Sequence, residues 1–219
     1  MTTEQTPRRW FSRFNSLGFL ILGALFLLLP FGAVSCETNG PSGAGTAHVS
    51  ATGFQLTTAD ATTDTTGVFA GDGDDERAAR LVNGVESDLT DHGDLRWTAV
   101  LTALTAAAGL IASLALARRG RAQRLTAAAL GLLGVALVAF LGIRLLSRWT
   151  DAVRDIAKFL VYLPEGEGQG LPGRAGEAVA LDLGFWISLA GFAAILLLNT
   201  VAFFRGRAPA TVPPPPKAA

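Results

Sequence analysis

The chain has 219 residues, half of them hydrophobic and 16% charged, and its formal net charge is zero. A soluble domain carries about 25% charged residues, so this composition is inconsistent with an ordinary water-soluble domain. The single cysteine excludes an intramolecular disulfide, and the balanced charge gives no overall electrostatic footprint for nucleic acid.

Four stretches of about 20 residues are almost free of charge, at 17–35, 97–117, 125–146 and 183–204. A helix rises about 1.5 Å per residue, so each stretch can cross a hydrocarbon core of about 30 Å. The sequence therefore predicts an all-α membrane protein with four transmembrane helices. The alternative is three spans that follow a signal peptide removed after export.

The short loop 118–124 contains four arginines and no acid, which predicts that it stays in the cytoplasm. The arm 1–16 and the tail 205–219 are also basic, so we expect both termini in the cytoplasm. Residues 37–96 hold eleven acids against three arginines, and 147–182 hold six acids against four bases, which predicts that both segments lie outside. This pattern predicts a multi-pass protein of the cell membrane.

The arm and the first span contain two features with competing interpretations. Arg8 and Arg9 precede Trp10 and Phe11 as in a twin-arginine export signal, but Pro7 stands where Ser or Thr is usual. Ordinary cytoplasmic arginines are therefore favoured. Pro30 lies near the outer end of the span, where we expect it to kink or end the helix.

Cys36 follows a run of small residues, 33–35, that resembles a bacterial lipobox. In a lipoprotein this cysteine would be lipidated and become the new N-terminus, leaving a three-span lipoprotein anchored through Cys36. Ala33 stands where Leu is usual, however, so the favoured interpretation is a retained first span with Cys36 at the membrane surface.

Segment 36–96 is the largest part expected in water. Residues 48–56 favour a strand with a turn or bulge at Gly53, residues 57–66 are turn-like, and 77–89 show helical spacing of apolar residues. Few large apolar side chains occur here, so the segment cannot bury much core. We expect a small, partly irregular extracytoplasmic cap between spans one and two.

Small residues recur at three-to-four spacing on the later spans, which lets helix backbones approach closely in lipid. The predicted helix-packing positions are Gly109, Gly131, Gly134, Gly142, Gly184, Ser188 and Gly191.

Beyond span three the chain becomes amphipathic over 148–163, and this piece either extends the span or lies on the membrane surface. Arg144, near the outer end of the span, is expected to reach the interface or to meet Asp151 or Asp155. The tail after residue 205 ends in a polyproline run that we expect to be disordered.

No nucleotide-binding loop, zinc signature or nucleophile elbow is present, so the sequence predicts no enzyme, no cofactor and no metal site. Asp72, Asp74 and Glu76 alternate as in a calcium-binding loop, but Arg77 and Asn83 occupy its essential Gly and Glu positions. A solvated acidic patch is favoured. A membrane-embedded enzyme would have to use the outer acids and histidine, namely Asp91, His92, Asp94, Glu177 and Asp182.

The run Leu-Pro-Phe-Gly-Ala-Val-Ser-Cys at 29–36, followed by Thr-Gly-Phe-Gln-Leu at 52–56, resembles a group of uncharacterised four-span membrane proteins of high-GC bacteria. That resemblance implies the span order but no activity. The layout, a large first outer loop and a short inner loop, is also similar to claudin-like tetraspans. The cysteine pair that those proteins carry in the first outer loop is absent here, so the similarity is one of topology.

These observations favour a non-enzymatic integral membrane protein that acts as a scaffold or accessory component. Its expected partners are the lipid bilayer and other membrane or envelope proteins, or further copies of itself, but not nucleic acid. The alternative is a subunit of a transport system or a small channel, which would need several copies to line a path.

Overall fold

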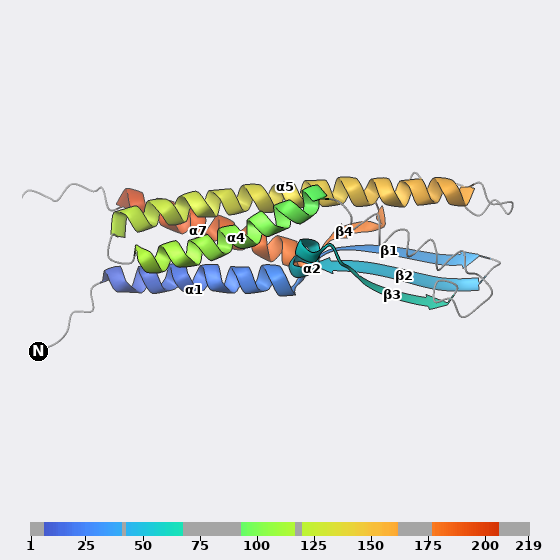
Figure 1. The fold of residues 1–219 in the computed structure, drawn as a ribbon, viewed down its shortest axis with the longest axis horizontal. Coiled ribbons are helices and arrows are strands. Elements are labelled where there is room, and N and C mark those ends of the chain that lie inside the picture. The colour runs from blue at the N-terminus through green and yellow to red at the C-terminus, as the bar shows by residue number, and fades with distance from the viewer. Residues whose placement is uncertain (1–6, 41–42, 68–92, 117–119, 162–176, 206–219) are drawn as a thin grey trace, which may run out of the picture.

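The structure, a computed structural model, describes residues 7–40, 43–67, 93–116, 120–161 and 177–205. Most of these residues are helical, and a small sheet completes the fold. Figure 1 shows the long helices side by side at one end of the molecule and the sheet at the other end. The helical segment expected at 77–89 lies outside the described residues.

Three helices in the described part of the chain are long and apolar enough to cross a membrane. They are α4 (Gly93–Ala115), α5 (Gly120–Val161) and α7 (Leu183–Arg205), and they confirm the apolar stretches predicted from residues 97, 125 and 183. The segment Phe14–Leu28 is a shorter apolar helix within α1 (Pro7–Leu28). α1 packs against both α4 and α7, which makes it part of the same bundle.

α1 ends earlier than the expected boundary at residue 35. Pro30 lacks a backbone N–H and disfavours a helical conformation for the residue before it, so the helix stops at Leu28. The helix thus ends just before Pro30, as one of the two expectations for this proline had it, and residues 30–35, assigned to the first span, belong to the strand β1 (Pro30–Gly40). Pairing within a sheet satisfies the backbone groups that the helix no longer bonds.

α5 continues far beyond the expected end of its span at residue 146. It has 42 residues and is therefore about 63 Å long, roughly twice the thickness of a hydrocarbon core. The amphipathic piece is thus an extension of the span. The helix continues past residue 146 because Leu141, Leu145 and Trp149 recur every fourth residue on one face and are all fully buried.

The expected irregular cap contains a four-stranded sheet. Its strands are β1, β2 (Gly43–Thr52), β3 (Thr62–Gly67) and β4 (Val179–Leu181), in the order β3-β2-β1-β4, and every pair is antiparallel. β4 comes from segment 147–182 and pairs with the first part of β1, from Gly32 to Val34. The two segments expected outside the membrane, 37–96 and 147–182, therefore contribute to one sheet.

A short helix, α2 (Gly53–Thr58), joins β2 to β3. Thr52 and Gln55 form a capping box, in which each side chain accepts a bond from the other residue's backbone N–H, so the strand ends where this helix begins. A side chain at Gly53 would collide with the carbonyl oxygen of Phe26 on α1. The strand expected over 48–56 and the turn expected over 57–66 are thus wrong in part, because α2 replaces the end of the strand and β3 replaces the second half of the turn.

The two faces of the sheet differ. One face packs against α5: a Cβ atom on Gly32 would lie 2.8 Å from Leu145 Cδ2 and 3.1 Å from the ring of Trp149. Val34, Val49, Ala51 and Val179 on this face are buried. The opposite face, the outer sheet face, carries mainly polar side chains that are exposed or half-buried; they are Ser35, Thr46, His48, Ser50, Thr62, Asp64 and Thr66.

Candidate functional site

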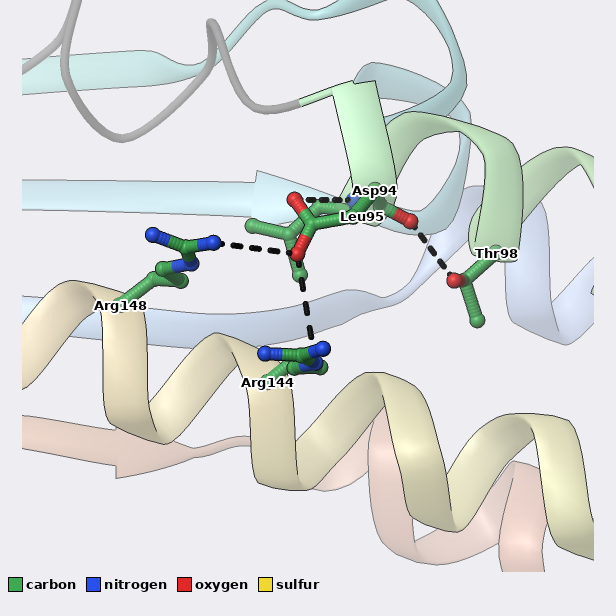
Figure 2. Close-up of polar contacts among 5 residues, drawn as sticks. All are labelled: Asp94, Leu95, Thr98, Arg144 and Arg148. Carbon is green, nitrogen blue, oxygen red and sulfur yellow. Dashed lines mark hydrogen bonds and ion pairs between the residues drawn. The ribbon is translucent and has the colours of Figure 1, made fainter.

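A charged cluster joins α4 to α5 where the helices meet the sheet. Figure 2 shows Asp94, on the first turn of α4, lying between Arg144 and Arg148, which are one turn apart on α5. The Asp94 Oδ2 atom is 3.5 Å from Arg148 Nη2 and 4.0 Å from Arg144 Nε. One carboxylate therefore faces two guanidinium groups.

The first turn of α4 fixes the position of Asp94. Its Oδ1 atom accepts a hydrogen bond from the backbone N–H of Leu95 at 3.1 Å, and its carbonyl oxygen accepts one from Thr98 Oγ1 at 2.7 Å. An acid in the first turn is also favoured by the partial positive charge of the helix N-terminus. The carboxylate is therefore held by its own helix, independently of the two arginines.

The arginines are only partly engaged by this carboxylate. The side chains of Arg144 and Arg148 are 45% and 42% exposed, against 32% for Asp94. Ion pairs this exposed contribute about 0–1 kcal/mol to stability. The Arg144 guanidinium also lies over the ring of Phe140, 5.2 Å from its centre, which orients it along the helix surface.

This arrangement corrects the prediction for Arg144. Its carboxylate neighbour is Asp94, fifty residues earlier in the chain, and Asp151 instead accepts a bond from Arg154 Nη1 at 3.1 Å. The side chain of Asp155 lies outside the described part of the chain. Sequence spacing pointed to the nearest acids along α5, and only the packing of α4 on α5 brings in Asp94.

Among the acids considered for an enzyme, the three that the structure describes lie on different parts of the fold. Asp91 and His92, like the acidic run 72–76, fall outside the described residues. Asp94 belongs to the arginine cluster, and Glu177 is exposed. Asp182 joins β4 to α7, where its backbone N–H donates to Phe31 O at 3.1 Å and its carbonyl accepts from Phe185 N. Across the described ranges, no group of three His, Cys, Asp or Glu side chains could hold a metal ion.

The predicted helix-packing positions all contact other parts of this chain. A side chain at Gly109 would collide with the ring of Phe19, one at Gly134 with Phe192, and one at Gly142 with Phe185. The remaining positions behave in the same way: a Cβ atom would meet Leu196 at Gly131, Pro30 O at Gly184 and Leu22 at Gly191, and Ser188 is fully buried. The small-residue faces are thus filled from within the chain, at three of the six glycines by a phenylalanine ring.

A buried amide pair lies between α1 and α7. Asn15 Nδ2 donates to Asn199 Oδ1 at 2.8 Å, and Asn199 Nδ2 donates in return to Asn15 Oδ1 at 3.1 Å. In the sequence Asn199 stands out as a lone amide in an apolar stretch, whereas Asn15 falls within the polar arm. Such reciprocal bonds between helices are a recognised stabilising contact in lipid.

The outer sheet face places Ser35, His48 and Asp64 side by side. The strand register pairs Ser35 with His48 and His48 with Asp64. These residue types occur in hydrolase triads, but nucleophilic catalysis also needs backbone donors for the oxyanion. The backbone N–H of Ser35 donates to Ala178 O at 2.9 Å and is already used. The geometry suits a solvated polar surface better than a catalytic centre.

Comparisons with protein-family models, with curated proteins and with solved structures find no match to this chain.

Proposed function

We propose that this chain is a non-enzymatic, four-span protein of the cell membrane that presents its outer sheet face to other membrane or envelope proteins. The four spans are α1, α4, α5 and α7, and both termini lie in the cytoplasm. The protein acts as a scaffold or accessory component, and the sheet is its binding module.

Support for α1 as the fourth span comes from its contacts at both ends. Asn15 meets Asn199 near the end of α7, and Leu29, directly after α1, meets Gly184 near the start of α7. α1 therefore lies along most of the length of α7. Large apolar side chains on its outer side are exposed, which suits lipid; they are Phe14, Leu17, Leu20, Ile21 and Leu28.

Support for the orientation comes from the arginines of α5. Arg121 and Arg124 belong to the basic stretch 118–124 and lie in the first turns of α5, and Arg144 lies twenty residues after Arg124, which is about 30 Å along a helix. The apolar part of α5 between them matches a hydrocarbon core. The positive-inside rule then places the start of α5 in the cytoplasm and the sheet outside.

The observation that carries the assembly role is the sheet seated on the extension of α5. Its outer face has small polar side chains on three adjacent strands, and Thr46 and Thr66 share a hydrogen bond of 2.7 Å across two of them. Among the strands that the structure describes, β3 lies at one end of the sheet and β4 at the other. Because the glycine faces are filled from within, this surface replaces them as the partner site.

Photo-crosslinking in intact cells tests this role. A photo-reactive amino acid placed at Asp64 or at Thr46 should yield adducts of higher mass that contain a second protein, because both positions lie on the outer sheet face. Gel shift and mass spectrometry of the adduct identify that protein.

The matched control is the same amino acid at Leu197, an exposed apolar position of α7 that we expect to face lipid. It should yield lipid adducts and no discrete protein adduct. If the two sheet positions give no protein adduct, or if Leu197 alone gives one, the sheet is not the partner surface and the proposal is wrong.

A further inference from the structure

We propose that Arg144 and Arg148 bind the phosphate of an anionic phospholipid in the outer leaflet. The proposal rests on the membrane placement given above but not on the scaffold role. It assigns a ligand to the cluster of Figure 2, and the ligand is one lipid headgroup with a net negative charge.

The charge balance of the cluster points to an anion. Two guanidinium groups share one carboxylate, so the cluster has a surplus of one positive charge. A phospholipid phosphodiester carries one negative charge, and its binding would make the cluster neutral. The nearby Arg96 donates to Thr57 O and Arg154 pairs with Asp151, so the charged groups next along the two helices have their own contacts.

The geometry leaves room for that anion. Both arginine side chains are more than 40% exposed, and the Arg144 Nε is 4.0 Å from its carboxylate, beyond hydrogen-bond distance. Guanidinium groups bind phosphate oxygens through forked N–H donors. Two of them one helical turn apart can bond different oxygens of the same phosphate.

The height of the cluster matches the position of lipid headgroups. Arg144 lies about 30 Å from Arg124 along α5, which is the thickness of a hydrocarbon core. Directly beside the cluster in sequence, Trp97 on α4 and Ile143 on α5 are 68% and 67% exposed. A lipid whose phosphate meets the arginines would lay its acyl chains along these apolar side chains, and tryptophan is typical of this depth.

The test is native mass spectrometry of the full-length protein in mild detergent, titrated with phosphatidylglycerol or phosphatidylcholine. We expect the anionic lipid to bind more tightly to the unmodified protein. Removing an arginine near a membrane surface weakens the attraction to anionic lipid about fivefold. The Arg144→Gln/Arg148→Gln variant should therefore lose most of the preference, whereas Arg154→Gln, an arginine further along the same helix, should keep it.

A variant that is expected to bind lipid more tightly provides a second test, because a misfolded protein would not gain affinity. Asp94→Asn removes the competing carboxylate but keeps an oxygen that can accept the Leu95 N–H bond. It should bind phosphatidylglycerol several-fold more tightly while the affinity for phosphatidylcholine changes little. Unchanged or weaker binding of phosphatidylglycerol by this variant would contradict the proposal.

Three further results would overturn the assignment. Equal affinity for the two lipids in the unmodified protein would exclude charge recognition, and a preference retained by the double variant would place the site elsewhere. Displacement of phosphatidylglycerol by inorganic phosphate at equal concentration would show that the site takes free phosphate. None of these results depends on a protein adduct at the sheet, so failure here and failure of the scaffold role are distinguishable.

Discussion

Phe192 on α7 occupies the space that Gly134 leaves open on α5. Adding one methyl group at this glycine tests how tight the contact is. Gly134→Ala would place a Cβ atom against the Phe192 ring. Overpacking a filled site costs about 1–3 kcal/mol, and each kcal/mol lowers the melting temperature of a protein of this size by about 2–4 °C. A thermal melt in detergent measures the fall.

Gly18→Ala on α1 is the matched control for that change. Its Cβ atom would lie 3.6 Å from Ile195 Cδ1, an ordinary contact, and alanine favours a helix over glycine by up to about 1 kcal/mol. Its melting temperature should stay equal or rise. Phe192→Leu should partly restore the Gly134→Ala variant. Equal melting temperatures for the two glycine variants would show that the Gly134 contact is not tight.

The spacing of small residues was readable from the sequence, but their partners were not. Glycines at three-to-four spacing indicate where another helix packs closely, but they do not indicate which residue of that helix makes the contact. The partners here are single rings such as Phe19 and Phe192, each from a helix distant in the chain. The same limit applies to Asp94, whose arginines lie fifty residues away on another helix.

At the scale of elements, α5 supports the sheet, and Trp149 on its extension is one of the residues that contact it. The side chain is 1% exposed, and a Cβ atom on Gly32 of β1 would lie 3.1 Å from its ring. Trp149→Ala should cost about 3–5 kcal/mol by leaving a cavity beneath the sheet. Hydrogen–deuterium exchange should speed up in β1 and β2.

The control for that prediction is Trp186→Ala, because Trp186 is exposed on α7 and its ring contacts Phe185 of the same helix. Exchange in β1 and β2 should then stay as in the unmodified protein. If Trp149→Ala accelerates exchange equally in α7 and in the strands, the tryptophan stabilises the whole bundle and the sheet does not depend on it specifically.

The long helices were predictable because uncharged runs of about 20 residues are rare outside membrane-spanning helices, whereas the strands were not. The first residues of β1 continue the apolar run of α1, so their composition favours a helix. Pro30 is the one signal that the helix ends before them. β3 is built mostly of threonine, which resembles a turn as much as a strand. β4 has only three residues, and its pairing with Gly32–Val34 joins segments that are nearly 150 residues apart.

At the scale of the whole molecule, the placement in the membrane can be tested by labelling. In a Cys36→Ser background, Thr62→Cys on β3 and Arg121→Cys at the start of α5 put single thiols at exposed positions. The proposed topology puts the first outside the cell and the second in the cytoplasm. An impermeant reagent on intact cells should label the first and not the second. Labelling after lysis shows that both thiols are reactive. Labelling of Arg121→Cys alone in intact cells would invert the orientation.

The fate of Cys36 is a second prediction at this scale. We expect the mature protein to begin before α1 and to carry no lipid on Cys36. Cleavage before this residue would remove α1 and the whole segment of β1 that pairs with β4. Mass spectrometry of the purified protein measures the mature mass. A chain that starts at Cys36 with a diacylglyceryl group would show a three-span lipoprotein instead.

The joints between the bundle and the sheet have a mechanical consequence. Leu29 alone separates α1 from β1, and Asp182 alone separates β4 from α7, while β1 and β4 are hydrogen-bonded to each other. The joints therefore have almost no slack. A partner that pulls on the sheet therefore applies force to α1 and α7 together. At the opposite end of these two helices, that force acts across the side-chain hydrogen bonds between Asn15 and Asn199.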